Sequence, residues 1–199
     1  MRILAFSDLH RNTNNAQLIV AAAATADIVI GAGDFATEGL GLSDTFEILK
    51  ALTIPTIIIP GNHDNPSELQ QNCQNHKNMY FLHGNAVTIN GIIFFGLGYE
   101  IPISNDKPWN QGIKESEAAT LLKACPESSV LITHTPPFGV ADLQTNGQHE
   151  GSQVIRKTVE STNPRLHLCG HIHHAWGTSG FINQCPVYNL GPSLNWFTV

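Results

Sequence analysis

Charged residues are scarce in this chain, and the positively charged ones are the scarcest. Only 13% of the 199 residues are charged, and ten lysines and arginines stand against sixteen acidic residues, for a net charge of −6. A nucleic-acid polymer attracts proteins through many cationic side chains, so this balance disfavours such a partner. Hydrophobic residues reach 42%, well above the disordered range, and we expect one folded domain over residues 1–199.

Long hydrophobic runs and clustered cysteines are also missing. No stretch approaches the length that crosses a bilayer, so no membrane association is expected. The opening residues, MRILAFSDLH, lack the hydrophobic region and cleavage site of a secretion signal. The four cysteines stand too far apart for a CxxC metal site and are typical of buried, reduced thiols. We therefore expect a cytoplasmic protein without disulfides.

Short apolar runs alternate with helical segments in the first part of the chain. The apolar runs are RILAFS, DIVIGAG and TIIIPG, and the segments between them are NNAQLIVAAAATA and LSDTFEILKALT. This β-α-β-α-β order predicts a largely parallel sheet with helices packed on it. Ligands of such open sheets bind beyond the carboxyl ends of the strands.

The pattern changes after residue 80. The stretch YFLHGNAVTINGIIFFGLGY carries Asn-Gly between two alternating halves, which predicts antiparallel strands joined by a tight turn. Helices are expected at KESEAATLLKA and SQVIRKTVEST, each followed by a strand, SSVLIT and RLHLCG respectively. The segment FINQCPVYNL is expected to form the closing strands.

Polar side chains follow the predicted strands at the points where these strands end. RILAFS leads to Asp8 and His10, DIVIGAG leads to Asp34, TIIIPG runs into the tetrapeptide GNHD, and two later strands end in histidine. Since the ends of parallel strands meet at one sheet edge, we expect these side chains to converge. Their carboxylate, amide and imidazole groups are ligands of divalent metals. The candidate ligands, enough for two ions, are Asp8, His10, Asp34, Asn62, His134, His171 and His173.

The spacing of these residues supports the same hypothesis. In D-x-H and H-x-H the two side chains would point to one side of an extended segment and could share a centre. Gly33, Gly61 and Gly170 would permit sharp turns before the polar residues. Taken singly, each candidate has a structural explanation as a helix cap, a turn residue or a buried histidine. No structural explanation accounts for all five strand ends together.

Five ordered blocks carry a resemblance to a known family. They are SDLH, GD at Gly33-Asp34, GNHD, TH at Thr133-His134 and GHIH, and they span residues 7 to 173. Together they resemble the calcineurin-like metallophosphoesterase superfamily. The resemblance implies an α/β fold, a four-layer α/β/β/α sandwich of two mixed sheets. It also implies a dinuclear centre of Mn, Fe or Zn ions between the sheets.

The resemblance further implies a role for each site residue. The first ion would be held by Asp8, His10 and His173. The second would be held by Asn62, His134 and His171, with Asp34 bridging the two. His63 would face the scissile group as an acid, and Asp64 would orient it and raise its basicity. The implied reaction is hydrolysis by in-line attack of a hydroxide shared by the two ions.

Details within the blocks point to a branch of the superfamily. THTPPFGVAD and PRLHLCGHIHHAWG resemble the small MPPED-like branch, which is linked to hydrolysis of phosphodiesters and cyclic nucleotides. Thr37 stands where the related GDxxD(R) pattern has an aspartate, and no arginine follows, which disfavours the protein phosphatases. Arg11 replaces a common glycine and would either contact a phosphoryl oxygen or lie in solvent at a helix entry. The expected substrate is a small phosphodiester.

Alternative functions remain open at this point. A general phosphomonoesterase would share the site, and a non-catalytic protein-binding scaffold of the same fold would have lost ligands, which this chain has not. A repair-type nuclease is disfavoured by the acidic charge and the short chain. Specificity is expected to depend on the loops 36–44, 99–112 and 138–150. His174, next to His173, would point the other way, and the less favoured alternative is that it lines the pocket rim together with Trp176. Phe138 would either flank the leaving group or pack in its loop.

Overall fold

The protein folds into two β-sheets that face each other, seen here in a computed structural model that describes residues 1–199. The first sheet has the strand order β11-β1-β2-β3-β4, in which only β11 is antiparallel to its neighbour. Its strands are β1 (Arg2–Phe6), β2 (Ile28–Ala32), β3 (Thr56–Ile59), β4 (Met79–Phe81) and β11 (Asn195–Thr198).

The second sheet has the order β5-β6-β7-β8-β10-β9. Its inner four strands are parallel, and β5 and β9 are antiparallel edges. Its strands are β5 (Asn85–Ile89), β6 (Ile92–Leu97), β7 (Val130–Thr133), β8 (Leu166–Cys169), β9 (Ser179–Ile182) and β10 (Cys185–Asn189).

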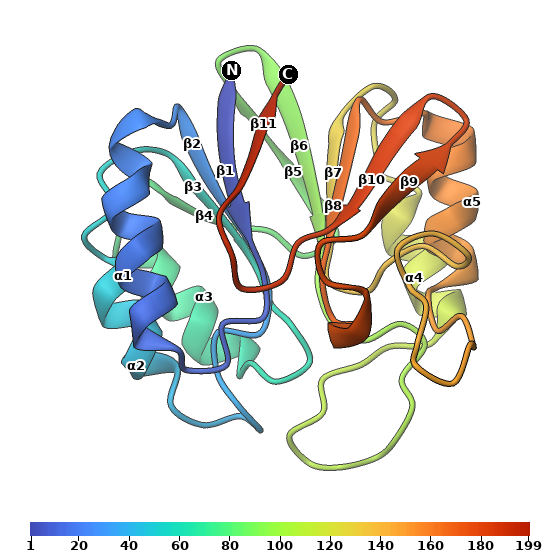
Figure 1. Cartoon of the computed structure of the whole chain (residues 1–199), viewed down its shortest axis with the longest axis horizontal. Helices are drawn as coiled ribbons and strands as arrows, with labels where there is room; N and C mark the ends of the chain where they lie inside the picture. Colours follow the sequence, from blue (N-terminus) through green and yellow to red (C-terminus); the bar gives the residue numbers. More distant parts are fainter.

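Helices cover the outer side of each sheet (Figure 1). The first sheet carries α1, α2 and α3, and the second carries α4 and α5. Their bounds are Thr13–Ala22 for α1, Leu42–Leu49 for α2, Pro66–Gln74 for α3, Glu115–Leu122 for α4 and Gln153–Thr162 for α5, with short 3-10 turns at Ala23–Thr25 and His173–Ala175. None of these helices combines the length and the apolar character that a membrane span needs.

Three buried hydrophobic clusters lie between these layers, one under each helical layer and one between the sheets. Strand β1 contributes to two of them. Leu4 and Phe6 pack in the cluster with α1 and α2, whereas Ile3 and Ala5 pack in the cluster between the sheets. Because both faces of the strand are buried, its apolar run is continuous. The layers form the predicted α/β/β/α sandwich of two mixed sheets.

The predicted hairpin is confirmed. Ile89 pairs with Ile92 in antiparallel register, which leaves a two-residue turn. Asn90 and Gly91 in that turn have φ values of 50° and 80°. Both lie in the left-handed region, which asparagine and glycine tolerate best and which a type I′ turn requires.

Three elements differ from the sequence-based expectation. Residues 80–81, expected in the antiparallel strands, belong to β4, which extends the first sheet in parallel. Helix α3 was not predicted, because its sequence PSELQQNCQ buries only Leu69 and Cys73 and so has a weak hydrophobic pattern. Strand β11 was not predicted either. It pairs with β1 through backbone bonds that no local pattern indicates.

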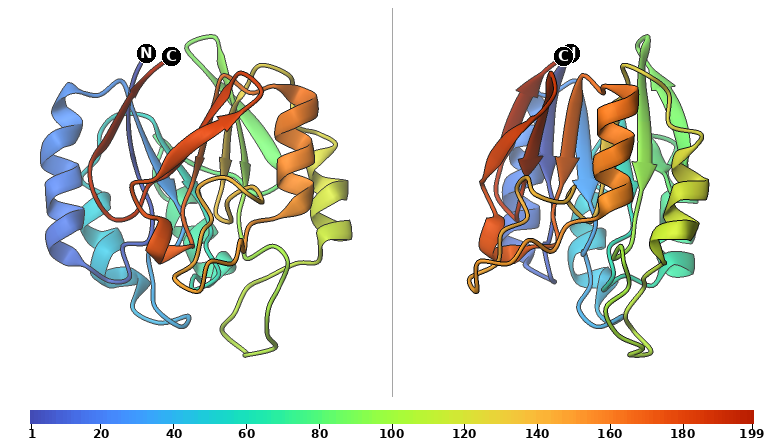
Figure 2. Two further views of the ribbon diagram at one scale, coloured as in Figure 1. Left: turned by 45° about the vertical axis from the view of Figure 1, so that its right-hand side comes forward. Right: turned by 90° about the vertical axis from the view of Figure 1, so that its right-hand side faces the viewer.

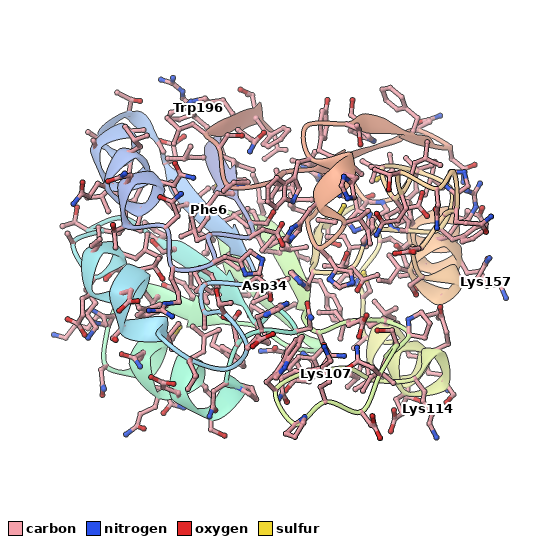
Figure 3. All side chains as sticks on the ribbon, turned by 60° about the horizontal axis from the view of Figure 1, so that its bottom comes forward. Phe6, Asp34, Lys107, Lys114, Lys157 and Trp196 are labelled. Carbon is pink, nitrogen blue, oxygen red and sulfur yellow. The ribbon has the colours of Figure 1, made fainter.

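The carboxyl ends of β1, β2, β3, β7 and β8 meet at one edge of the two sheets. The polar residues that follow these strands predicted this arrangement. Figure 2 shows the connecting loops gathered at this end of the molecule. Figure 3 views that end and places Asp34 near its middle, between the two halves of the sandwich.

Candidate metal centre

The loops that carry the predicted ligands turn sharply. Asp8, His10, Asp34 and His171 have φ values of 54°, 43°, 58° and 68°, in the left-handed region that side-chain-bearing residues rarely adopt. The expectation that D-x-H and H-x-H would be extended segments is therefore wrong. Because of these turns, side chains two residues apart point in different directions. The two histidines of GHIH therefore belong to two different groups of donors, an outer and an inner one, which are described below.

Only one of the three glycines is needed for a left-handed turn. Gly33 has a φ of 94°, whereas Gly61 and Gly170 lie outside the left-handed region. A Cβ at Gly61 would collide with a carboxylate oxygen of Asp34, and one at Gly170 with that of Asp8. These two glycines therefore let the backbone approach the carboxylates closely, and neither needs a left-handed φ for its turn.

The outer group of donors consists of Asp8, His10 and His173. His10 Nε2 lies 3.1 Å from His173 Nε2, and His173 Nε2 lies 3.8 Å from Asp8 Oδ1. With Asp34, one donor atom of each residue lies within 4.8 Å of the others. The set therefore has the compactness of a coordination sphere.

The inner group consists of Asn62, His134 and His171. Asn62 Oδ1 lies 3.1 Å from His134 Nε2 and 3.1 Å from His171 Nδ1. The other ring nitrogen of His134, Nδ1, lies 2.8 Å from the carbonyl oxygen of Ala32 and donates to it. This bond keeps the proton on Nδ1, so that Nε2 faces the group. Burial opposes the charge of His134, but Asp34 outweighs it and raises the pKa of His134 to about 10. Nε2 is therefore protonated at pH 7 without a metal, and an ion that binds there would displace this proton.

Asp34 lies between the two groups. Its Oδ2 is 3.5 Å from His10 Nε2 in the outer group and 3.4 Å from His134 Nε2 in the inner group. Its Oδ1 accepts a hydrogen bond of 2.8 Å from the backbone N–H of His63. One carboxylate oxygen is thus held by the backbone, and the other faces both groups.

Burial and neighbouring charges set the ionisation of the centre. Burial opposes the charge of Asp34, but His134 stabilises it and holds the pKa of Asp34 well below its usual range. Burial, together with repulsion from His134, lowers the pKa of His171 to about 4. At pH 7 Asp34 is therefore an anion and His171 a neutral base, the forms in which both groups bind metals.

The seven predicted ligands thus come together, and their donor chemistry fits divalent ions. Four imidazoles, two carboxylates and one amide oxygen are the mixed nitrogen and oxygen donors that Mn, Fe and Zn accept. The assignment of each residue to an ion stays a prediction.

The predicted partnership of His63 and Asp64 is not present. Asp64 is fully buried and accepts hydrogen bonds from four backbone N–H groups, those of Gly61, Asp34, Phe35 and Ala36. It therefore holds the loop of Asp34 rather than the ring of His63. The reason is that the backbone N–H groups of Asp34, Phe35 and Ala36 bind the carboxylate of Asp64, whereas the ring of His63 lines the site cavity.

The ring of His63 has other partners. Its Nδ1 accepts a 2.9 Å hydrogen bond from the backbone N–H of Glu38, and Trp109 stacks on the ring at 4.4 Å. Burial lowers the pKa of His63. An Nδ1 that accepts carries no proton, so the ring is neutral with its proton on Nε2, not the protonated acid that we predicted.

A cavity of about 290 Å³ opens onto the centre. His174 lines it, which is the alternative that the sequence reading disfavoured. Phe138 lines a neighbouring cavity of about 690 Å³ that shares His171 with the site. Arg11 pairs with Asp44 at 2.7 Å, which supports the helix-entry alternative over a phosphoryl contact. The residues lining the smaller cavity are Asp34, Asn62, His63, Gln144, His171, His173 and His174.

Sequence reasoning missed three residues around the centre and did not predict the role of a fourth, Trp176. Trp176 was considered only for the rim, but its indole N–H donates to Asp8 Oδ2 at 3.1 Å and its ring centroid lies 4.2 Å from that of His173. Trp109, Glu100 and Asn110 come from the loop predicted to set specificity, and all three contact site residues. No motif marks these positions, because the loop lies outside the five sequence blocks and reaches the site only through its fold.

Facing sheets with clustered aspartate, asparagine and histidine donors at one edge define a metal-dependent phosphoesterase architecture. The family model of calcineurin-like phosphoesterases matches residues 1–175, and the chain belongs to this family. The family places it among the hydrolases of phosphoric ester bonds.

The alignments with known relatives cover most of this chain. It is 29% identical to the human metallophosphoesterase domain-containing protein 1 over 205 residues, covering 88% of this chain and 61% of that protein. It is 27% identical to a Synechococcus protein described as a probable cyclic nucleotide phosphodiesterase, covering 81% of this chain and 64% of that protein. The chain therefore spans less than two thirds of the length of both relatives.

Solved structures show the same fold. TT1561 of Thermus thermophilus superposes with a TM-score of 0.79 at 20% identity, covering 98% of this chain and 97% of that one. A dimetal phosphatase from Danio rerio superposes with a TM-score of 0.65 at 10% identity, covering 96% and 88% respectively.

Proposed function

We propose that this protein is a dinuclear metal-dependent hydrolase of small phosphodiesters, cyclic nucleotides among them. The position of Asp34 carries the proposal. One oxygen of this buried carboxylate lies 3.5 Å and 3.4 Å from histidine nitrogens of the outer and inner groups. A carboxylate between two sets of donors is the arrangement that a pair of ions needs.

The chain's own residues would divide the work. Asp8, His10 and His173 would hold one ion, Asn62, His134 and His171 the other, and Asp34 both. When bound, such a pair activates a water nucleophile and stabilises the charge that develops on the phosphoryl oxygens. His63 would offer its Nε2–H as a hydrogen-bond donor to an ester oxygen, since Nδ1 is already occupied by Glu38.

The charge of the surroundings favours diesters over monoesters. Neither the site cavity nor the two cavities beside it has a lysine or arginine in its lining, and the neighbouring linings contain Glu38, Glu100, Glu115 and Glu150. A phosphodiester carries one negative charge and a monoester close to two near neutral pH. The extra charge would meet acidic side chains rather than cations, which disfavours the monoester.

Two further features support the proposal more generally. The relative from Synechococcus is described as a probable cyclic nucleotide phosphodiesterase.

The four cysteines are free and buried, which suits the reducing cytoplasm that we propose as the location. The donor set accepts Mn, Fe or Zn, and supply would decide among them.

The test compares matched esters on metal-reconstituted protein. Bis-nitrophenyl and mono-nitrophenyl phosphate, followed by cyclic nucleotides, are assayed after loading with Mn²⁺, Fe²⁺ or Zn²⁺ and counting ions per chain. We expect two ions and a higher kcat/KM for the diester. Equal or faster turnover of the monoester would point to a general phosphomonoesterase. Two ions without turnover of any ester would favour the non-catalytic scaffold.

A further inference from the structure

A chain of buried polar side chains runs from the loop at 99–112 to the inner group. Asn62 Nδ2 donates to Asn110 Oδ1 at 2.8 Å, and Asn110 Nδ2 donates to Glu100 Oε2 at 2.6 Å. The other oxygen of Glu100, Oε1, lies 3.7 Å from His171 Nε2. His171 Nδ1 in turn faces Asn62 Oδ1 at 3.1 Å, so the four side chains close a ring.

The carboxylate of Glu100 determines which side chain donates and which accepts in each hydrogen bond of this ring. An ionised carboxylate only accepts hydrogen bonds, so Asn110 must turn its NH₂ toward Glu100 and its oxygen toward Asn62. Asn62 must then turn its NH₂ toward Asn110, which leaves Oδ1 facing His134 and His171. An amide oxygen can bind a cation, whereas an amide NH₂ cannot. The flip state of Asn62 therefore depends on a residue that does not touch it.

Glu100 has a second contact that an amide could not match. When Nδ1 of His171 binds a cation, Nε2 carries the proton and needs an acceptor. Glu100 Oε1 lies beside it, beyond hydrogen-bond distance but close enough for electrostatic attraction. Glu100 thus faces two donors on different oxygens, His171 at Oε1 and Asn110 at Oε2, and its Oε2 accepts a second hydrogen bond, of 3.1 Å, from the backbone N–H of Ser104.

We propose that Glu100 and Asn110 are positioning residues that orient Asn62 and His171 toward the inner ion. The inference rests on the proposed dinuclear function and extends it to a loop outside the five sequence blocks. The backbone anchors this loop independently, through bonds from Gln111 N to Asn62 O and between Glu100 and both Gln111 and Ile113. Side-chain substitutions in the ring therefore test orientation separately from loop attachment.

Single substitutions should weaken the inner ion selectively. Outer-shell changes around metal ligands typically cost about 10–100-fold in metal affinity, and we expect a loss of this size for Asn110→Asp and for Glu100→Gln. Asn110→Asp places two carboxylates against each other. Glu100→Gln has one amide nitrogen that must face either Asn110 or His171, both of which are donors. Asn105→Ala, an exposed change in the same loop, is the matched control and should bind as wild type.

The double variant Asn110→Asp with Glu100→Gln provides the decisive measurement. Gln at position 100 would donate to Asp at 110 and accept from His171, while Asp at 110 would still accept from Asn62. The backbone N–H of Ser104, which bonds the same Oε2 as Asn110, would lose its acceptor. The direction of the ring is restored, so the affinity should rise above that of both single variants. A merely structural role would predict additive losses instead.

The assay is Mn²⁺ binding followed by electron paramagnetic resonance, which distinguishes isolated from paired ions without any substrate. Wild type and Asn105→Ala should reach the paired signal, the single variants should show isolated ions at the same loading, and the double variant should regain the pair. Unchanged pairing in both single variants, or no recovery in the double variant, would overturn the role of Glu100 and Asn110. Absence of pairing in the wild type would instead refute the dinuclear function itself.

Discussion

The outer and inner groups offer similar donor atoms in different surroundings. The side chains of His173 and His10 are 46% and 20% exposed, whereas that of His134 is fully buried and Asn62 is only 5% exposed. The outer rings face each other at 3.1 Å. In the inner group His134 is held by Ala32 and Asn62 by Asn110, whereas in the outer group the buried Asp8 is held by Trp176 and the two histidines are not held in this way.

One centre can thus combine rigid, buried donors with donors that are accessible to solvent. Donors fixed by burial and hydrogen bonds lose little conformational entropy when they bind, so the inner group is preorganised. Exposed histidines must be ordered by the ion itself, so the outer group should bind more weakly and exchange faster. Five substitutions, in four experiments, test this difference.

The largest effect is expected for Asp34→Asn, because Asp34 faces both groups. An amide retains the shape but loses the charge that the ions share, and both should weaken by more than the ~10–100-fold typical of outer-shell changes. Metal analysis after dialysis measures the ions that remain. Full retention of two ions per chain would contradict the bridging assignment.

Next come His134→Ala and His173→Ala, which compare the two groups directly. Each should release mainly one ion, but only His134→Ala should destabilise the metal-free fold. It leaves a cavity and an unpaired Ala32 carbonyl and should cost about 2–5 kcal/mol, against about 1 kcal/mol or less for exposed His173. Urea unfolding in the presence of a chelator measures both. Equal losses of stability would end the distinction between a rigid and an adaptable group.

The third experiment uses His63→Ala, which should affect the reaction but neither group of donors. Both ions should remain, and turnover of an alkyl diester should fall about 10²–10³-fold, as when one transition-state donor is removed. The loss should be smaller for a nitrophenyl ester, whose leaving group needs less stabilisation.

Metal counts and parallel kinetics on the two esters decide the role of His63. Release of an ion would make His63 a ligand. An equal loss on both esters would make it a ground-state contact.

The smallest effect is expected for Trp176→Phe. Phenylalanine keeps a ring beside His173 but removes the N–H that donates to Asp8. Loss of a hydrogen bond to a charged group costs about 1.5–3 kcal/mol, so the outer ion should weaken roughly 10-fold or somewhat more while the inner ion is unaffected. Mn²⁺ titration measures this, with the exposed Trp196→Phe as control. Weakening of both ions alike would show that Trp176 does not act through Asp8.

Much of the centre could be predicted because its ligands directly follow strands. An apolar run buried on both faces predicts its strand, and parallel strands bring their ends to one edge, so Asp8, Asp34 and His134 had to meet. The orientation of side chains within the turns could not be predicted. Residues with a left-handed backbone, such as His171, change the direction of the side chains around them. The spacing of D-x-H and H-x-H therefore wrongly predicted that the two side chains point to the same side.

The layered α/β class, the order of the donors along the chain and their meeting at one sheet edge can be read from the amino-acid sequence. They follow from hydrophobic runs and strand ends, which are local properties. Three features depend on the folded chain: Asp64 holds the Asp34 loop, His63 is a neutral donor, and Glu100 is linked to Asn62 through Asn110. Such contacts join segments dozens of residues apart, and they depend on how irregular loops fold back over the sheets, for which no periodic pattern exists.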